Sequence, residues 1–380
     1  MKHITLIINC LFLFLVFSCN NESKPDQEPE IIRIDIKDNT RKQLNLSDLH
    51  TIPLETNKKS LIGDVGRSRF FNNRFYILNK NRFKKPTLFA FDTKGKLINK
   101  TKIGKGPGEV IEPFAFAINQ ENSTIVLHDQ AQNPSFVYDL DLNFKSKIKH
   151  DYIFNYDFYH IAKDTFLVYH HIPKVRDHNP SEEDCYSYTL YTEGFTKAKH
   201  LEILVHGDQR IHLHTPVSIR NKEVYFVAPY NYNIYQLLNG ESLVRYTLDF
   251  GNLSFSTNEL KTMSDDDYRD FISSGKRAAV GGIYKSKEFL VILTVIDGKA
   301  YTFFRSLKNG EIYCLNDLID SNLLPSDLLL WGVTNDGSFY GLLEPEQMLE
   351  FQKSSGKFKE YDVDENDNPY IFLFKVREPK

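Results

Sequence analysis

The sequence predicts an all-β fold, a six-bladed β-propeller with four-stranded antiparallel blades whose ring is closed by the terminal strands. Three observations lead to this expectation. The chain of 380 residues is longer than a single ordinary core covers. Its 29 Phe and 21 Tyr, against a single Trp, favour β-structure. A unit made of a polar turn and an alternating aromatic and β-branched strand returns six times along the chain.

The repeated unit recurs at intervals of about 40 to 65 residues, and a second hairpin-like stretch follows each copy. The copies contain Phe75, Ile125, Phe166, Val224, Phe289 and Phe339. The second stretches begin at Leu88, Ser135, Ser187, Asn233, Tyr301 and Met348, and most carry a glycine where a tight reversal needs a positive φ. Six copies of about four strands describe a propeller. A pair of β-sandwiches, the alternative, gives no reason for a fixed period.

The expected propeller occupies residues 31–380. Its blades are predicted near residues 61–103, 113–149, 153–205, 214–250, 278–317 and 327–376, with a helical insertion at about 256–275. Ser256 with Glu259, and then Ser264, supply helix-capping patterns for this insertion. Strands at Ile31 to Ile36 and Tyr370 to Val376 are left over to close the ring, which removes the sheet edges that favour aggregation.

Residues 1–18 have the pattern of a lipoprotein signal peptide. The apolar run from Ile4 to Phe17 is too short for a transmembrane helix, which needs about 20 residues, and fits a secretory signal. Ser18 and Cys19 end this run in a way that resembles a bacterial lipobox, in which the cysteine is lipidated and becomes the mature N-terminus. Residues 19–30 are acidic and contain proline, as in a flexible tether. A cleaved signal with an incidental cysteine is the alternative.

The formal net charge of −3 provides no basic footprint, so no nucleic-acid partner is expected. Apart from Cys10 in the signal and Cys19, the chain contains only Cys185 and Cys314, which either form one bridge or remain separate buried thiols. No segment after the signal is apolar over a membrane-spanning length. We therefore expect membrane attachment through the N-terminal lipid alone.

Several motifs together resemble those of the six-bladed β-propeller lipoproteins of Gram-negative bacteria. They are the lipobox, Thr51 to Thr56 (TIPLET), Phe89 to Asp92 (FAFD) with Gly95, Gly104 to Glu109 (GKGPGE), and Asn368 to Ile371 (NPYI), which opens the C-terminal strand NPYIFLFKV. The resemblance implies the propeller fold and a place in the cell envelope, at the outer membrane, facing the periplasm or the outside. It carries no established catalytic residue onto this chain.

Loop lengths predict which end of the propeller carries the site. In a blade with strands A to D, the A–B and C–D turns share one end, and the B–C loops and D–A links share the other. The expected A–B turns are short, whereas long and varied segments such as His170 to Asp184 and Gly251 to Arg277 fall at the B–C/D–A end. Because function concentrates in variable loops on a rigid scaffold, we expect the site at that end.

The candidate ligand-binding residues are Arg82, Lys105, Glu109, His128, Asp129, Tyr230 and Tyr232. The first belongs to a basic loop, the next two to the glycine-rich link, and the tyrosines to a stretch whose rings and amides suit a sugar or a peptide. The glycine-rich link lacks the Lys-Ser/Thr of a phosphate-binding loop, and a tight structural turn is its simpler interpretation. Packing between blades and plain solvation are the alternatives for the aromatic and basic segments.

Two segments carry side chains of the kind that ligate metals. His212 and His214 share one face of a predicted strand and His206 precedes them, a spacing that suits zinc, although neutral loop histidines are the alternative. Asp362 to Asn368 has oxygen ligands at alternate positions, as in a calcium loop, but lacks the glycine and glutamate that such a loop needs. No cofactor is therefore certain, and calcium and zinc are the metals to test.

No nucleophile motif is present, because GxSxG is absent and no Ser/His/Asp set can be assembled from the sequence. The expected function is that of an envelope-anchored, non-catalytic module that binds a glycan, a peptide or a partner protein. The alternative is a divalent-metal-dependent envelope hydrolase or lyase, whose carboxylate and histidine ligands come from separate blades and meet in the funnel. Three or more such side chains around one ion would distinguish the enzyme from the binding module.

Overall fold

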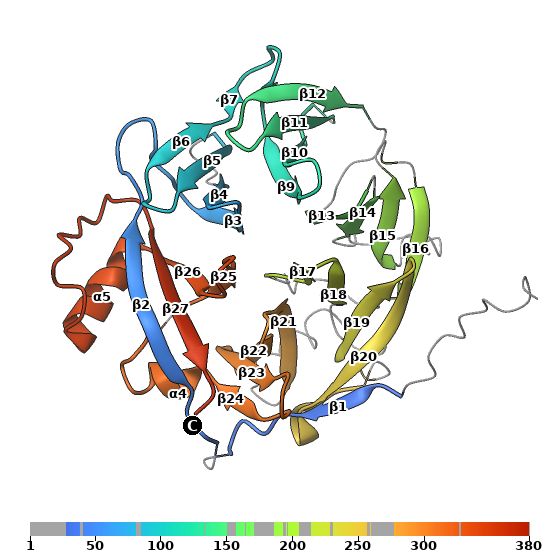
Figure 1. Cartoon of the computed structure of the whole chain (residues 1–380), viewed down its shortest axis with the longest axis vertical. Coiled ribbons are helices and arrows are strands. Elements are labelled where there is room, and N and C mark those ends of the chain that lie inside the picture. The colour runs from blue at the N-terminus through green and yellow to red at the C-terminus, as the bar shows by residue number, and fades with distance from the viewer. Residues whose placement is uncertain are drawn as a thin grey trace, which may run out of the picture.

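The computed structural model describes residues 28–38, 41–80, 85–132, 134–149, 157–163, 165–170, 186–192, 195, 197–204, 214–228, 231–256, 259, 277–326 and 328–379. Six sheets are arranged in a ring around a central axis (Figure 1). Each is built on four antiparallel strands, so the chain is the six-bladed β-propeller that the repeats predict. Within these ranges no helix is long and apolar enough to cross a membrane.

The blades follow one another around the ring, each with one strand at the axis and one at the rim. From the inner to the outer strand, they are β3 (Val65–Phe71), β4 (Arg74–Asn79), β5 (Thr87–Asp92) and β6 (Leu97–Lys100) in blade 1; β9 (Pro113–Asn119), β10 (Thr124–Asp129), β11 (Ser135–Asp139) and β12 (Phe144–Ile148) in blade 2; β13 (Asp157–Ala162), β14 (Thr165–Tyr169), β15 (Tyr186–Thr192) and β16 (Lys197–Leu204) in blade 3; β17 (Val217–Arg220), β18 (Glu223–Val227), β19 (Asn233–Leu238) and β20 (Glu241–Asp249) in blade 4; β21 (Ala278–Lys285), β22 (Phe289–Ile296), β23 (Lys299–Ser306) and β24 (Ile312–Cys314) in blade 5; and β25 (Leu330–Val333), β26 (Phe339–Leu343), β27 (Tyr370–Arg377) and β2 (Asn45–Pro53) in blade 6.

The second strand of a blade is buried on both faces. In β4 and β10, for example, nearly every residue is inaccessible to solvent, because the neighbouring blades cover both sides of the sheet. The apolar core is accordingly divided into clusters that lie between consecutive blades, such as the cluster that joins blades 1 and 2 around Tyr76 and Phe116. The repeated unit of the sequence corresponds to the A–B turn and this buried second strand.

Two of the A–B turns show why asparagine recurs at the start of the unit. Asn72 and Asn73 have φ values of 47° and 57°, and Asn221 and Lys222 have 49° and 67°. Two consecutive positive φ angles define the type I′ hairpin turn, and asparagine tolerates this conformation better than most residues. The turns are therefore tight, and the inner strands end close to one face of the ring.

The ring is closed by strands from the two ends of the described chain. β2 pairs antiparallel with β27, from Asn45 opposite Arg377 to Pro53 opposite Tyr370, and supplies the outer strand of blade 6. Asn368 fixes the end of this closure, because its buried side-chain amide donates to the carbonyls of Glu55 at 2.7 Å and Ser60 at 2.9 Å. Its side-chain oxygen accepts the Ile62 N–H at 2.7 Å.

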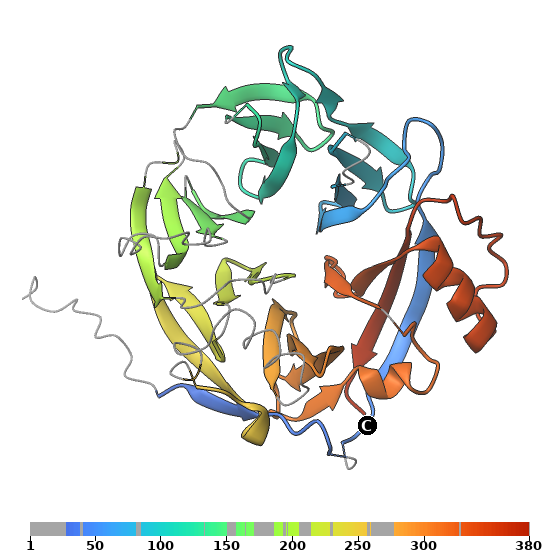
Figure 2. The same cartoon turned by 180° about the vertical axis from the view of Figure 1, so that it is seen from behind.

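The N-terminal strand takes a different place from the one expected. β1 (Glu30–Arg33) pairs parallel with β20, with Ile32 opposite Leu248, and forms a fifth strand on blade 4. Figures 1 and 2 both show it outside β20 at the rim of the ring. Burial of Ile32 and Ile34 in the core beside blade 4 explains this position. The strand predicted at Ile31 to Ile36 therefore covers an outer edge, and the partner of the C-terminal strand is β2.

The stretch that begins at Met348 is a helix and not the predicted hairpin. α5 (Pro345–Ser355) starts with a capping box between Glu344 and Gln347, carries a proline in its first turn, and ends at Gly356 with φ 71°. These are regular start and stop signals of a helix. Met348 and Phe351, three residues apart, are buried against the sheet of blade 6, so the apolar face of the helix explains the pattern read as a strand.

The remaining elements are short. They are the parallel pair β7 (Lys102–Ile103) and β8 (Glu109–Val110), the 3-10 turn η2 (Gly251–Leu253) and the helix α4 (Asn316–Ile319). The predicted cap of the helical insertion is present, since the Ser256 N–H donates to Glu259 at 2.6 Å and the Glu259 N–H donates to the Ser256 hydroxyl at 3.3 Å. Residues 260–276 of that insertion lie outside the described residues.

Candidate functional site

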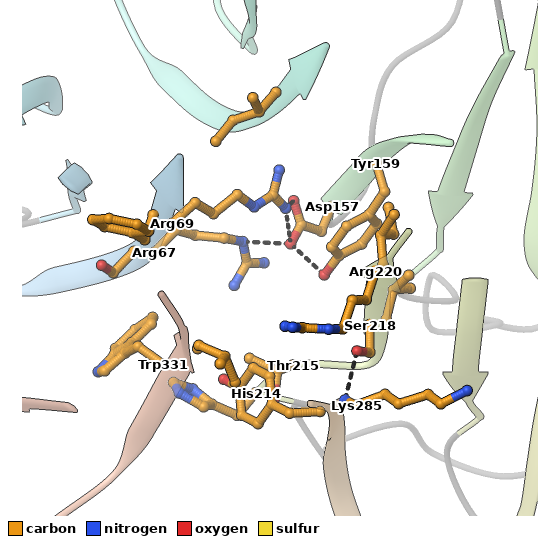
Figure 3. A pocket seen from close by; sticks show the side chains of 18 of the residues that line it. Arg67, Arg69, Asp157, Tyr159, His214, Thr215, Ser218, Arg220, Lys285 and Trp331 are labelled. Atoms are coloured by element: carbon orange, nitrogen blue, oxygen red, sulfur yellow. Dashed lines mark hydrogen bonds and ion pairs between the residues drawn. The ribbon is translucent and has the colours of Figure 1, made fainter. Parts of the chain in front are cut away.

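A cavity of about 190 Å³ lies on the axis of the ring, and all six blades contribute to its wall. The inner strands provide Arg67 (β3), Ile118 (β9), Asp157 (β13), Arg220 (β17), Tyr284 (β21) and Trp331 (β25), among others (Figure 3). A single water needs only roughly 10–15 Å³ of such space. The central channel is therefore large enough to hold a ligand of several non-hydrogen atoms.

The cavity extends to the end of the ring that carries the A–B turns. Gln120 follows the last residue of β9, and Arg220 and Lys285 are the last residues of β17 and β21. This end is opposite to the one where the loop lengths predicted the site. Much of the predicted end, including residues 171–185 and 205–213, lies outside the described residues.

A buried carboxylate holds two arginines in the wall of the channel. Asp157 is 1% exposed and lies 2.9 Å from Nε of Arg67, which is 7% exposed. The guanidinium of Arg69 donates to both oxygens of the same carboxylate, at 3.0 and 3.1 Å. Because one carboxylate faces two guanidinium groups, this cluster keeps one net positive charge.

Surrounding groups fix the geometry of this cluster. The Tyr159 hydroxyl donates to Asp157 at 2.9 Å, and the Phe158 N–H donates at 2.9 Å. Arg69 also donates to the carbonyl of Phe116, and its guanidinium lies 4.9 Å from the centre of the Phe116 ring and 4.5 Å from that of Tyr159. Burial, together with the neighbouring carboxylate, raises the pKa of Tyr159, so its hydroxyl stays protonated and acts as a donor.

The two other cations in the wall differ in their partners. Nζ of Lys285 is directed away from the channel and donates to Glu223 at 2.8 Å and to the Tyr225 hydroxyl at 3.0 Å. The side chain of Arg220 is directed into the cavity beside Ser218 (Figure 3), and within the described residues its guanidinium forms no hydrogen bond or ion pair. The channel thus offers one guanidinium group whose hydrogen-bonding capacity is unused by the described chain.

Trp331 and His214 form the opposite part of the wall. Their rings meet edge to face with centroids 4.2 Å apart. Burial, reinforced by the charge of Arg67, lowers the pKa of His214 to about 4. The imidazole is therefore neutral near pH 7 and leaves the positive charge of the channel to its arginines.

Lys80 adds a further cation next to the cluster of Arg67, Arg69 and Asp157. Its ammonium group lies 4.4 Å from the centre of the Phe114 ring, and its side chain crosses Gly66 so closely that a Cβ there would lie 2.3 Å from Cγ of the lysine. Burial, and the charge of Arg67, lower the pKa of Lys80 to about 8. The lowered pKa of Lys80 thus reflects mainly the burial of its ammonium group, with a smaller effect from the positive charge of Arg67.

The glycine-rich link between blades 1 and 2 is a self-contained turn. The Glu109 carboxylate accepts the Gly106 N–H at 2.9 Å, and a Cβ on Gly104 would lie 2.0 Å from Oε2 of that glutamate. Gly108, at φ 72°, has no room for a side chain beside Phe144. Lys105 is exposed. Lys105 and Glu109 therefore lie in the D–A link and not in the lining of the channel cavity.

Two other candidates serve the loop of blade 2. His128 and Asp129 are fully buried at the end of β10. The Asp129 carboxylate accepts the N–H groups of Ile111 at 2.6 Å, Ala131 at 3.0 Å and Gln132 at 3.1 Å. It thus holds the B–C loop of blade 2 against the link that enters this blade from blade 1, which is a structural role.

Of the aromatic and basic candidates Arg82, Tyr230 and Tyr232, only Tyr232 lies within the described residues. Tyr232 donates to the carbonyl of Ala278 at 2.7 Å, and its ring packs against Phe250 and Phe255 between blades 4 and 5. Arg82 and Tyr230 lie outside the described residues, as does Cys19. Among the described candidates, Glu109 and Asp129 lie close together, since the Gln132 side-chain amide donates to the Glu109 carbonyl at 3.2 Å and to the Asp129 carboxylate at 2.9 Å, whereas Tyr232 packs elsewhere, between blades 4 and 5.

Only one of the three histidines predicted as metal candidates lies within the described residues. His214 lines the channel, while His206 and His212 lie outside the described residues. Within the part of the chain that is described, no three His, Cys, Asp or Glu side chains are placed to hold a metal ion. In the acidic turn, Asp364 accepts the Asn366 N–H at 2.8 Å and Asn368 takes part in ring closure. Cys314 is a free buried thiol, and Cys185 lies outside the described residues.

Arg67, Arg69, Asp157 and Arg220 were missed by sequence reasoning, which searched the loops. A signal was present, because Arg67 and Arg69 alternate on the strand that precedes the Asn72–Asn73 turn and so share one face. In a propeller the strand before an A–B turn lies at the axis. Charged residues on such strands are therefore candidates for the channel wall.

A family model described as "Domain of unknown function (DUF4934)" matches residues 31–375. A candidate exported protein from Bacteroides fragilis, 15% identical, matches with a TM-score of 0.73 over 92% of this chain and 100% of that chain. A member of the DUF4221 family from Bacteroides vulgatus, 10% identical, matches with a TM-score of 0.55 over 89% and 99% of the respective chains. At these identities both structures show the fold alone. No curated protein matches the sequence.

Proposed function

The chain belongs to the DUF4934 family, and we propose that it is an envelope-anchored β-propeller that binds a ligand in its central channel. The observation that carries this proposal is Arg220, whose guanidinium enters the cavity from β17 without a partner among the described residues. A cation on the wall of a cavity of this size favours a bound group of opposite charge. The channel is accordingly a ligand-binding site, and the ring of blades is its rigid frame.

The envelope location rests on separate observations. The apolar run that ends at Ser18 and Cys19 is that of a lipoprotein signal, and residues 19–30 provide a tether between the lipid and the first strand. The solved protein from Bacteroides fragilis with the same fold is itself described as a candidate exported protein. We propose attachment to the outer membrane through lipid on Cys19.

The ligand classes remain those that the sequence suggests, a glycan, a peptide or a partner protein. The wall of the channel combines cationic, hydroxyl and aromatic side chains, as in binding sites that orient a polar ligand with a few groups. A metal-dependent hydrolase or lyase stays a prediction, because no observation in the described residues favours it over binding.

The proposal is tested by thermal unfolding of the full chain, purified in detergent, in the presence of acidic and neutral sugars and short peptides. Ile118→Trp fills the channel, whereas Ile98→Trp adds the same ring at an exposed site on β6, away from the cavity. We expect at least one compound to raise the melting temperature of the wild type and of Ile98→Trp but not of Ile118→Trp. A compound that stabilises all three proteins equally binds elsewhere and contradicts the proposal.

A further inference from the structure

Arg220 lines two neighbouring cavities and not the channel alone. The second, of about 330 Å³, lies at the same end of the ring, where the A–B turns of blades 5 and 6 meet the end of β27. We name this second cavity the rim groove; its wall includes Arg220, Lys287, Asp336, Lys375 and Arg377. A ligand that contacts Arg220 from the channel is therefore next to the rim groove.

The rim groove, like the channel, has an excess of positive charge. Lys375 is paired, at 3.0 Å with Asp336 and 3.2 Å with Asp48. Lys287 and Arg377 are exposed, and among the described residues neither forms an ion pair. Glu288 is the one other carboxylate in this wall. Two adjoining cavities with surplus cations match a ligand that carries acidic groups in succession.

The side chains around Arg220 favour a sugar as the carrier of the acidic group. Ser68, Thr215 and Gln120 place hydroxyl and amide groups in the channel wall, and Trp331 and Tyr340 place aromatic rings there. A sugar ring presents hydroxyls that both donate and accept, and a face of C–H groups that packs on aromatic rings. Hydroxyls and amides in the wall can satisfy those sugar hydroxyls in both senses.

We propose that the channel and the rim groove together bind an acidic oligosaccharide, which rests on the proposed function of the channel. The terminal unit occupies the channel with its carboxylate on Arg220, because a guanidinium pairs with a carboxylate through two parallel hydrogen bonds. The following acidic unit lies in the rim groove near Lys287 and Arg377. The net charge of the Arg67, Arg69 and Asp157 cluster attracts the first carboxylate into the channel.

The test is calorimetric titration of the full chain with galacturonate, its trimer, galactose and triglutamate. Galactose differs from galacturonate only in carrying CH₂OH in place of the carboxylate. We expect the acidic trimer to bind about tenfold or more tightly than the monomer, and galactose to bind at least about tenfold more weakly than galacturonate. Equal binding of galactose and galacturonate, or tight binding of triglutamate alone, overturns the inference.

Variants assign the contacts. Arg220→Gln is expected to weaken both galacturonate and its trimer by about 10- to 100-fold, and Arg220→Lys to recover only part of this loss. The double variant Lys287→Ala with Arg377→Gln should weaken only the trimer, towards the affinity of the monomer. Lys94→Ala, an exposed site outside both cavities, is the matched loss of one charge and should change neither. The same melting temperature in each variant excludes unfolding as the cause.

Failure of this inference is distinguishable from failure of the proposed function. If a compound of other chemistry binds and Ile118→Trp abolishes its binding while Arg220→Gln does not, the channel is a binding site but not one for acidic sugars. If galacturonate binds to Arg220→Gln and to Ile118→Trp as tightly as to the wild type, both the inference and the channel site are contradicted.

Discussion

Arg67 on the inner strand of blade 1 reaches across blade 2 to Asp157 on the inner strand of blade 3, where its Nε lies 2.9 Å from the carboxylate. The two residues are 90 positions apart in the sequence. Arg69 joins the same carboxylate and donates to a main-chain carbonyl of blade 2 on the way. The three blades are thus tied together at the axis, and the tie itself keeps a surplus positive charge beside the cavity.

Replacing Asp157 with asparagine removes the shared partner of two arginines. Breaking a buried ion pair on one side typically costs about 3–5 kcal/mol, because the remaining charges stay desolvated. We therefore expect Asp157→Asn to lower the free energy of unfolding in urea by about 3 kcal/mol or more. Asp141→Asn is the control, since this half-exposed carboxylate pairs with Arg74 at 2.8 Å and should cost less than about 1 kcal/mol. Equal losses in the two variants would show that the axial cluster contributes no special stability.

Asn368 is expected to be required for stable ring closure. Asn368→Ala leaves the carbonyls of Glu55 and Ser60 and the N–H of Ile62 without their partner in a buried site. Since an unsatisfied buried group costs about 1–3 kcal/mol, we expect a loss of about 2–4 kcal/mol in urea unfolding. Asn366→Ala, two residues away in an exposed turn, should cost less than about 1 kcal/mol. Full stability of Asn368→Ala would mean that pairing of β2 with β27 closes the ring unaided.

Stability should fall on acidification because of histidines that are buried in the neutral form. Burial, reinforced by the neighbouring His200, lowers the pKa of His170 to about 4, against about 6.5 in an unfolded chain. Between these values the unfolded state binds the proton and the folded state does not, so the stability present above pH 6.5 is lost as the pH falls towards 4. His170 accounts for up to about 3 kcal/mol of this fall in the free energy of unfolding. His170→Gln should reduce the loss between pH 7 and pH 4.5, and an unchanged pH profile would contradict the assignment.

Lipidation at Cys19 is tested directly in cells. We expect the wild-type chain to incorporate labelled palmitate and to fractionate with the outer membrane. Cys19→Ala should abolish both, whereas Cys10→Ala, within the apolar run of the signal, should leave both unchanged. Labelled Cys19→Ala protein would show that the lipid is attached elsewhere.

The sequence predicts the fold well because the propeller repeats a local signal. Each buried second strand, such as the one around Phe75 or Ile125, follows a polar turn, so the period can be read without tertiary information. The same use of alternating apolar residues as a strand signal led to the wrong prediction of a hairpin at Met348, where the chain forms the helix α5. There the capping pair Glu344 and Gln347 and the stop at Gly356 are stronger local signals than the apolar spacing.

The site is harder to predict from the sequence, because its residues are far apart along the chain and no local pattern links them. Arg67, Asp157 and Arg220 belong to three blades, and only closure of the ring brings them to one cavity. Asp129 shows the converse, since a polar residue at the start of a loop resembles a ligand-binding group and instead satisfies main-chain N–H groups. In this fold, polar residues on the inner strands at the axis indicate the position of the site better than polar residues in the longest loops do.

The most direct measurement is a fluorescence titration, because Trp331 is the single tryptophan of the chain and lines the channel. The full chain is titrated with trigalacturonate near pH 7, in parallel with Arg220→Gln and Lys94→Ala. We predict a saturable change in the emission of the wild type and of Lys94→Ala, with a much weaker apparent affinity in Arg220→Gln. Binding that is saturable by calorimetry but leaves the emission of Trp331 unchanged, or that is equally tight in Arg220→Gln, would contradict a ligand site in the central channel.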